Sequence, residues 1–524
     1  MTEMTTARRV IGIDLGIASA HTVRVRREDG SLVCARRCEP NQKSMEAILQ
    51  VALAGAEAQT RVEVVFEPTG PAWLPVAVFF ASRGATIYRV SSAQSADLRS
   101  FLSRHAKSNR IDADALAWMP LIAPWSVTPL QLPGPDRASL DRRVRVTDRL
   151  TRLASTHKVR IKALVRSLLP MSPLKGDLSQ SDVAVLQRTG ADPHRLLGLG
   201  PQRLTDTIRR VSNGHQGRER ADEWLEAAHL SLELYQDSSA VPFSDLAAEV
   251  ETEVRLLLAT LKERAPHERV RELAYRQVDP CQLARSLPGV ATISAPALVS
   301  LIGDPHRFPD GAHLRSFTGL TAKASETGES DRKGGHISKA GPNLLRATLI
   351  GAADTARKLD PQLARLYYVQ MVERGACHNK ALCVVAAHLA ERVWSVLLRG
   401  TPYQICDVDG TAISAREGRD IVSAHWTVPE EVRRRRRSKK SRGKVPQQVL
   451  AGHVHGRSVA STRRPSPPPM LGQPMTSVKD VLETAFRRAH EWRQRGYECF
   501  RLTPSSPLGI SCRPCPSWPR RARA

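Results

Sequence analysis

The chain has 524 residues, 41% of them hydrophobic, which is enough for two or three domains with separate cores. No apolar run approaches the roughly 18–20 residues of a transmembrane helix, and no secretory leader is evident, so we expect a cytoplasmic protein without a membrane partner. Nine scattered cysteines, an odd number, favour reduced thiols over a disulfide framework. The net charge of +26 points to a polyanionic partner, with nucleic acid as the default.

Residues 8–130 alternate between strand and helix patterns. Residues 10–16 form an apolar strand, residues 21–26 and 31–34 form a hairpin around a Glu-Asp-Gly turn, and residues 61–66 and 85–90 form further strands. Helical spacing covers residues 44–58 and 71–82. This order predicts an α/β unit, a mixed sheet flanked by helices.

Residues 131–280 carry no convincing strand pattern. Apolar residues fall near heptad-like spacing, which predicts a long helix and favours a coiled coil: Leu140, Val144, Leu150, Leu153, Ile161 and Leu164. Pro170 and Pro173 end this helix. A second helical stretch is expected over residues 221–273. We interpret the segment as a helical connector, either a bundle or a dimerising arm.

Residues 281–405 predict a third, mostly α-helical unit. A loop rich in Gly, Ser and Lys covers residues 321–341, and amphipathic helices are expected at 343–358 and 380–398. Residues 420–524 are basic and proline-rich, with 22 Lys+Arg against 5 Asp+Glu in residues 431–524, so we expect this tail to be largely disordered. A nucleic-acid-binding arm and a merely solvated extension both remain open for it.

Three acidic residues stand out in the basic N-terminal unit. Asp14 lies inside an apolar strand pattern, where an unpaired carboxylate is costly. Glu67 ends a second such pattern, and Asp112 opens a helix. If the two strands are neighbours, the three carboxylates converge, and oxygen ligands of this kind suit Mg²⁺ or Mn²⁺ in phosphodiester chemistry. Taken singly, each is more often a strand-end or salt-bridge residue.

The segment Ile11–Gly16 also matches the first phosphate loop of actin-like ATPases and sugar kinases. Those proteins need a second phosphate loop and an adenosine loop downstream, and we find neither. The metal-site interpretation is therefore preferred.

Several segments, in this order, resemble the DEDD-type insertion-sequence transposases of the IS110 family. The resemblance covers about residues 8–402 and rests on the following segments: Ile11–Gly16, Phe66–Gly70, His105–Ala117, Leu287–Val290, Gly303-Asp304, Arg307-Phe308, Phe317–Leu320, Glu326–Gly328, Ile337–Gly341 and Leu345-Arg346. Each segment alone is weak, whereas their order and spacing together are specific.

The resemblance implies a RuvC-like, RNase H-fold domain at 8–130 that binds divalent metal through four acidic residues. It also implies a coiled-coil connector at 131–280 and a transposase domain at 281–405 that supplies a serine nucleophile. The active site would join both domains within a homodimer or tetramer. Partners would be DNA, as element ends and target, and a structured guide RNA. The place of action would be the bacterial cytoplasm, in association with the nucleoid.

Two positions depart from the family pattern. The metal ligands would be Asp14, Glu67, Asn109 and Asp112, with asparagine in place of the third acid. Asn109 and Asp112 lie three residues apart and share a helix face, whereas Asp114 lies about 200° round the helix from Asp112. At the nucleophile position the chain has a threonine.

That threonine is Thr327, which precedes a glycine as the family's serine does. A threonine hydroxyl can attack phosphorus, although its methyl group crowds the approach. Ser325 and Ser338 are nearby alternatives, and we expect Ser338 to be a helix N-cap. Basic residues around the loop are candidate nucleic-acid contacts: Lys323, Arg332, Lys333, Lys339 and Arg346. We expect Trp73 and Trp118 to be core residues.

Two other functions remain open. A RuvC-like junction nuclease would use water as the nucleophile and would form no covalent link. A decayed transposase that only binds nucleic acid would explain Asn109 and Thr327. The regular apolar pattern over about 400 residues argues against advanced decay.

Overall fold

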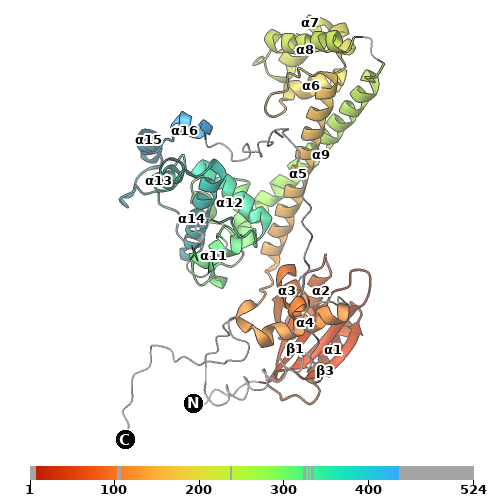
Figure 1. Cartoon of the computed structure of the whole chain (residues 1–524), viewed down its shortest axis with the longest axis vertical. Coiled ribbons are helices and arrows are strands. Elements are labelled where there is room, and N and C mark those ends of the chain that lie inside the picture. Colours follow the sequence, from red (N-terminus) through yellow and green to blue (C-terminus); the bar gives the residue numbers. More distant parts are fainter. Residues whose placement is uncertain are drawn as a thin grey trace, which may run out of the picture. The chain divides into compact units, whose positions relative to one another are not determined.

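The computed structural model describes residues 7–102, 108–236, 239–322 and 335–435, together with the backbone of two short strands at 326–327 and 330–331. These residues form two compact units, residues 7–132 and residues 133–435 (Figure 1).

The first unit contains a five-stranded sheet in the order β3-β2-β1-β4-β5. The strands are β1 (Arg8–Asp14), β2 (His21–Arg27), β3 (Leu32–Cys38), β4 (Arg61–Phe66) and β5 (Thr86–Arg89). The first three strands are antiparallel neighbours, and β1, β4 and β5 run parallel. The predicted mixed sheet and its hairpin are therefore confirmed.

Helices cover both faces of this sheet because its strands carry apolar side chains on both sides. On one face, Ile11, Ile13 and Phe66 pack with α1 (Gln42–Leu53) and α2 (Trp73–Ala81). On the other face, Val10 and Val65 pack with α3 (Ser92–Leu102) and α4 (Asn109–Ile122), including a buried Trp118. The alternation of side chains along a strand assigns each residue to one of these layers.

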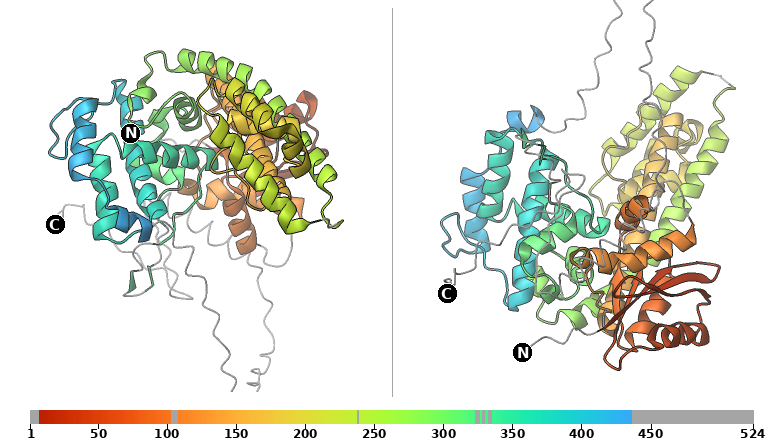
Figure 2. Two further views of the ribbon diagram at one scale, coloured as in Figure 1. Left: turned by 90° about the horizontal axis from the view of Figure 1, so that it is seen from above. Right: turned by 60° about the horizontal axis from the view of Figure 1, so that its bottom comes forward.

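The second unit is organised around two long helices, α5 (Pro135–Leu168) and α9 (Phe243–Val278), which lie side by side (Figures 1 and 2). Their contacts run in opposite directions along the chain. Thr147 meets Arg271, and ten residues further along α5, His157 bonds to Glu253 at 2.5 Å. The two helices thus form an antiparallel hairpin within one chain. Whether they also form a coiled coil or a dimerising arm stays a prediction.

Each end of this hairpin belongs to a different core. At the distal end, Ile161 and Val165 of α5 pack with Trp224 and other residues of three shorter helices: α6 (Gln180–Thr189), α7 (Pro193–Val211) and α8 (Arg218–Tyr235). At the other end, Leu140 and Tyr275 enter the core of the C-terminal helices. Because the connector contributes to both cores, it folds as part of the second unit.

The C-terminal core is helical, as predicted. Its elements are η2 (Leu283–Ser286), α10 (Ser294–Ile302), η3 (Pro305–Arg307), α11 (Gly311–Thr318), α12 (Asn343–Ala356), α13 (Pro361–Tyr368), a π-helix labelled η4 (Val369–Glu373), α14 (His378–Arg399), α15 (Ala415–His425) and α16 (Glu430–Arg435). By length and composition α14 could cross a membrane, which is weak evidence alone. Half of its apolar window is buried, as in a core helix.

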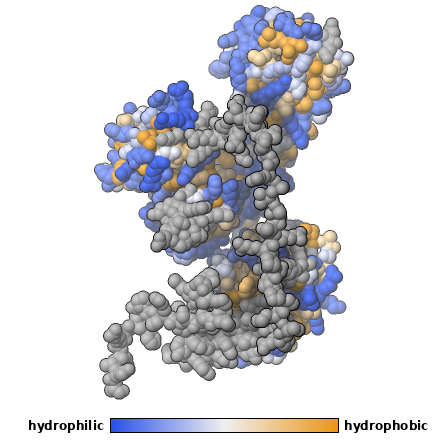
Figure 3. Space-filling model, in the orientation of Figure 1, coloured by the Kyte–Doolittle hydropathy of each residue, from blue (hydrophilic) through white to orange (hydrophobic). Residues whose placement is uncertain are grey.

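The structure refines two predictions about helix limits. The helical stretch expected over residues 221–273 consists of two helices, because α8 ends at Tyr235 and α9 starts at Phe243. Order also extends past residue 420, since Val422 and Val428 are buried and α15 and α16 continue to Arg435. Hydrophilic residues gather over α16 (Figure 3). The rest of the tail, residues 436–524, lies outside the described residues.

Candidate active-site residues

Asp14 and Glu67 lie side by side at one edge of the sheet. The parallel register pairs Ile13 of β1 with Phe66 of β4, so the next residue on each strand is one of the two acids. Asp14 is the last residue of β1 and half-buried, rather than in the strand interior as the sequence pattern suggested. Asp14 lies four residues after Val10, and Glu67 lies two residues after Val65, so along each strand both acids point to the same face as these valines. This is the face that α3 and α4 cover.

Gly12 allows α4 to lie close to this part of the sheet. A Cβ at Gly12 would overlap the backbone oxygen of Ala113 and the backbone nitrogen of Ala117. Further along, Arg26 of β2 pairs with Asp114 at 2.6 Å and lies over the Trp118 ring at 4.4 Å. Asp114 thus fixes α4 to the sheet, while Asp112 stands one residue from the close contact at Ala113.

Asp112 carries an arginine partner. Arg99 of α3 donates from Nη1 to Oδ1 of Asp112 at 2.9 Å, and this hydrogen bond, with the charges of Asp112 and Glu67, raises the pKa of Arg99. The Asp112 side chain is only 14% exposed. A single cation from the protein therefore already interacts with two of the three acids among the predicted metal ligands.

The residues at this edge have the chemistry of a magnesium site, but they are not gathered into one. Among the described residues, no three His, Cys, Asp or Glu side chains lie close enough to hold one ion. Asn109 is the first residue of α4 and is exposed, after an N-cap at Ser108 whose Oγ accepts from the Ile111 amide at 3.3 Å. Carboxylate and amide oxygens at one sheet edge fit a hard divalent cation, provided that Arg99 leaves Asp112.

Thr327 lies in the second unit, on a small hairpin. β6 (Glu326–Thr327) pairs with β7 (Ser330–Asp331), with Thr327 opposite Ser330. The candidate contacts Lys323, Arg332 and Lys333 and the alternative nucleophile Ser325 lie outside the described residues. The loop that carries Thr327 can nevertheless be described at its base.

The base of this loop is closed by backbone contacts. Ser338 donates from its amide to Thr321 O at 2.8 Å, and Lys339, at φ +58°, donates to Gly319 O at 3.1 Å. A Cβ at Gly341 would overlap Phe317 O. The expectation of a helix N-cap at Ser338 was wrong, because α12 begins at Asn343 with Pro342 in the cap position.

Arg346 supports this closed base from within the fold. It is 9% exposed, and its Nη1 donates to Thr318 O at 3.3 Å and to Gly341 O at 3.2 Å. Nη2 donates to Asn343 Oδ1 at 3.1 Å. A buried guanidinium with three protein acceptors has little left to offer a phosphate, so we reinterpret Arg346 as a positioning residue. Lys339 is exposed and remains a candidate nucleic-acid contact.

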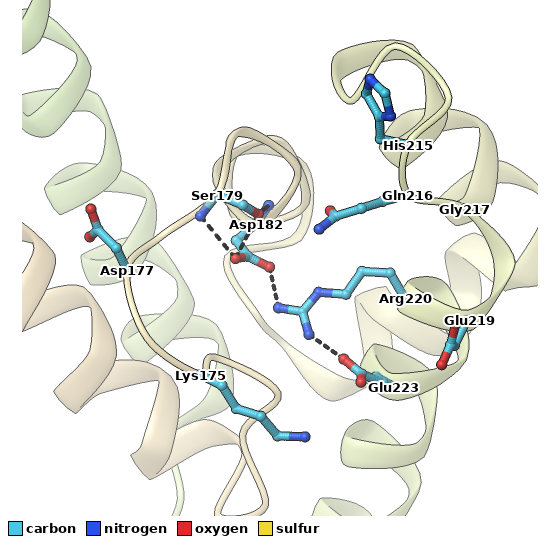
Figure 4. A pocket seen from close by; sticks show the side chains of 10 residues that line it. All are labelled: Lys175, Asp177, Ser179, Asp182, His215, Gln216, Gly217, Glu219, Arg220 and Glu223. Carbon is cyan, nitrogen blue, oxygen red and sulfur yellow. Dashed lines mark hydrogen bonds and ion pairs between the residues drawn. The ribbon is translucent and has the colours of Figure 1, made fainter. Parts of the chain in front are cut away.

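A polar cavity of about 520 Å³ lies at the distal end of the second unit, between the loop before α6 and the start of α8. Figure 4 shows Arg220 at its centre, between Asp182 and Glu223, and ion pairs join it to both. Asp182 is also the partner of Ser179 in the capping box of α6. The lining as a whole has two basic and four acidic side chains, so the cavity carries a net negative charge and does not suit a phosphate.

The contacts made by Arg99 and Arg346 could not be predicted from the sequence. Arg99 lies on a helix whose polar residues look solvated, and only the approach of α3 to α4 places it against Asp112. Arg346 was visible as part of a Leu-Arg segment, but its burial depends on the fold of residues 318–343. Trp118 is buried, as predicted, and Trp73 is partly buried and stacks on Phe66 with ring centroids 6.4 Å apart.

Comparisons with known proteins match residues of both units. A model of DEDD transposases of the IS110 type, described as a transposase, matches residues 11–170. A second model, described as "Transposase IS116/IS110/IS902 family", matches residues 281–368. The first match spans the acidic sheet edge, and the second spans the loop that carries Thr327.

Three curated relatives are similar over parts of the chain. An IS110 element protein of 43.6 kDa from Streptomyces coelicolor is 32% identical over 23% of this chain and 29% of its own length. The transposase of element IS1111A from Coxiella burnetii is 31% identical over 24% of this chain and 34% of its own length. A 44.8 kDa IS116 protein from Streptomyces clavuligerus is 25% identical over 60% of this chain and 75% of its own length.

The matched segments thus span about a third of the first two relatives and three quarters of the third. The first family model covers the unit with the predicted acids and continues through α5 of the second unit, and the other model covers part of the C-terminal core with the predicted hydroxyl. In both units the chain is similar to the IS110 family of DEDD transposases.

Proposed function

We propose that this chain is a DNA transposase of an insertion element, which cuts and rejoins DNA strands with an RNase H-like N-terminal unit and a hydroxyl nucleophile of the C-terminal unit. The observation that carries the proposal is that Asp14 and Glu67 lie side by side at one edge of the sheet, on the face covered by α4, the helix that carries Asp112. The strand order β3-β2-β1-β4-β5, antiparallel and then parallel, is the order expected of an RNase H-like fold.

Asp14, Glu67 and Asp112, with the amide oxygen of Asn109, would hold Mg²⁺ or Mn²⁺. When bound, such an ion neutralises charge at a phosphate and activates an oxygen nucleophile. The protein's own part is to present these oxygens on rigid elements. Gly12 and the Arg26–Asp114 pair fix α4 beside β1, and release of Arg99 frees the Asp112 carboxylate.

The nucleophile would be Thr327. Its Oγ attacks a DNA phosphorus and loses its proton, a phosphothreonyl bond forms, and the displaced DNA oxygen leaves as a hydroxyl. A DNA hydroxyl then attacks the same phosphorus, which rejoins the strands and returns the threonine. Arg346 would act here as a positioning residue, because it joins the two sides of the base of the loop at Thr318 and Gly341.

Further parts of the proposal concern domains and partners. The transposase domain covers residues 281–405, after the helical connector 131–280. The partners are the element's DNA ends, the target DNA and a structured guide RNA, and the working form is a homodimer or tetramer. The protein acts in the bacterial cytoplasm, in association with the nucleoid. The family resemblance supports these parts.

A covalent-trapping assay tests the chemistry. Purified protein is incubated with Mg²⁺, RNA from the DNA that flanks the gene, and labelled DNA carrying the element junction, and is then run on a denaturing gel. We expect an adduct that is lost in Thr327→Ala and Asp14→Ala but kept in Thr327→Ser and Ser338→Ala. Cleavage without an adduct would instead indicate a junction nuclease that uses water.

A second candidate function is nucleic-acid binding without catalysis. It is favoured by the Arg99–Asp112 pair together with Asn109 at the third acid position, because both lower the charge available to a metal. In the same assay this protein would bind the DNA but give neither cleavage nor adduct.

A further inference from the structure

Helix α5 is far more basic than its partner in the hairpin. Its 34 residues hold ten Lys or Arg and three Asp, whereas the 36 residues of α9 hold six basic and seven acidic residues. Since both helices pack the same cores, packing does not explain the difference. The charge of α5 therefore calls for an explanation on its exposed side.

Five exposed arginines form a stripe along α5, which we call the arginine stripe: Arg142, Arg145, Arg149, Arg152 and Arg160. At 100° per residue these positions fall within about 80° of one another, and the stripe is ~27 Å long. The residues buried against α9 and the cores, such as Leu140, Val144 and Ile161, lie on the opposite side of the helix. The stripe thus faces solvent along most of the helix.

An exposed charged helix is usually stabilised by pairs of opposite sign, and part of the stripe follows that rule. Arg145 pairs with Asp141 at 2.7 Å, Arg152 pairs with Asp148 at 2.9 Å, and Arg160 pairs with Glu253 of α9 at 3.3 Å. In the part of the chain that the structure describes, no ion pair joins Arg142 or Arg149 to a carboxylate. Surface pairs of this kind are weak, so even the paired arginines can exchange their partners for a phosphate.

The composition of α5 favours a duplex over a single strand as the bound nucleic acid. Proteins that bind single strands stack bases on aromatic side chains, and α5 contains no Phe, Tyr or Trp. A straight helix with an arginine at every third or fourth position instead suits a regular row of backbone phosphates. Such contacts position a duplex and read no sequence.

We propose that the arginine stripe of α5 binds the phosphodiester backbone of a nucleic-acid duplex. The proposal goes beyond the chemistry proposed above, because this binding needs neither the metal ligands nor Thr327. DNA and RNA duplexes share the backbone that the stripe recognises, so each is measured separately.

The test compares Arg142→Gln/Arg149→Gln with a matched control, Arg255→Gln/Arg269→Gln, which removes two exposed arginines from α9. The full-length protein is titrated into labelled 30-base-pair DNA, 30-base-pair RNA and a 30-nucleotide single strand of mixed sequence, at several salt concentrations. Each phosphate contact contributes about one unit to the slope of log K against log salt. We expect the stripe variant to lower that slope by about two for one duplex or both, with several-fold weaker binding, whereas the control keeps the wild-type slope.

Equal slopes for the stripe variant and the wild type would overturn the proposal, as would an equal decrease in stripe variant and control. If the stripe variant has a changed sedimentation coefficient but unchanged duplex binding, a second copy of the chain covers the stripe. This outcome would also overturn the proposal. The single strand is expected to respond less than the duplexes. Asp14→Ala and Thr327→Ala leave the stripe intact, so both variants should bind duplexes as the wild type does. Loss of catalysis and loss of duplex binding can therefore be told apart.

Discussion

Arg99 and Asp112 form an ion pair, 2.9 Å from Nη1 to Oδ1, near the edge of the sheet where Asp14 ends β1 and Glu67 follows β4. A guanidinium at this place competes with a metal ion for the same carboxylate. The pair therefore connects the structure to the metal dependence of the proposed reaction.

Replacing Arg99 should strengthen the binding of divalent metal. In Arg99→Gln the carboxylates of Asp112 and Glu67 lose the positive charge of Arg99. A divalent cation then binds two carboxylates whose charge is no longer neutralised by the protein. We expect a several-fold lower Kd for Mn²⁺, measured by paramagnetic resonance of the free ion. Arg83→Gln is the control, because Arg83 pairs with the exposed Glu46. Unchanged Mn²⁺ affinity in Arg99→Gln would mean that the acids at this edge do not form the metal site.

Gly12→Ala should separate α4 from the sheet. The added methyl group would meet backbone atoms of Ala113 and Ala117, which cannot move as a side chain end can. Overpacking of this kind costs about 1–3 kcal/mol, so we expect a lower Tm and weaker Mn²⁺ binding together. Gly351→Ala, on α12 with open space at the Cβ position, should leave both unchanged or raise the Tm slightly. A wild-type Tm in Gly12→Ala would contradict the close packing described here.

Arg346→Gln should loosen the loop that carries Thr327. The change leaves the buried acceptors at Thr318 and Gly341 without their donor, at a cost of about 1–3 kcal/mol. Hydrogen exchange should become faster at Leu320 and Ile337, and adduct formation should fall more than duplex affinity does. If Arg346 instead contacts phosphate, Arg346→Gln will lower the salt slope of binding by about one and leave the exchange unchanged. Arg399→Gln, at an exposed position, serves as the control.

The pair His157–Glu253 should make the helical hairpin sensitive to acid. The hydrogen bond from His157 lowers the pKa of Glu253, and the hydrogen bond from Arg160 lowers it further, by a smaller amount. Because the folded pKa lies below the ordinary value of about 4.3, the unfolded chain takes up the proton first as the pH falls. The stabilisation is therefore complete above about pH 5 and is lost as the pH falls through the folded pKa.

Glu253→Gln should accordingly lower the Tm at pH 7 and lessen the further fall of Tm between pH 5 and pH 3. Thermal melts across this range, monitored by circular dichroism, provide the measurement. Glu249→Gln, an exposed position of the same helix, is expected to behave like the wild type. Parallel Tm curves for Glu253→Gln and wild type would show that this carboxylate contributes nothing to the acid response.

Sequence alone determined the local elements and the chemistry that they carry. Apolar alternation placed the strands that end at Asp14 and Glu67, and helical spacing placed the helix that Asp112 opens, because these periods depend only on which side chains meet water. It also indicated the similarity to the IS110 family, since the motifs around Glu67 and Thr327 keep their order. Helix limits were less certain, as the break between α8 and α9 shows.

Only the tertiary structure decided which partner each charged residue has. Arg99 meets Asp112 because α3 packs on α4, Arg26 meets Asp114 because Gly12 lets α4 approach the sheet, and Arg346 is buried because the loop closes over it. None of these contacts leaves a periodic trace in the sequence, because an ion pair needs two residues at the right distance and no particular spacing. A charged residue looks the same in the sequence whether it contacts water, a phosphate or a carboxylate, and the fold makes that choice.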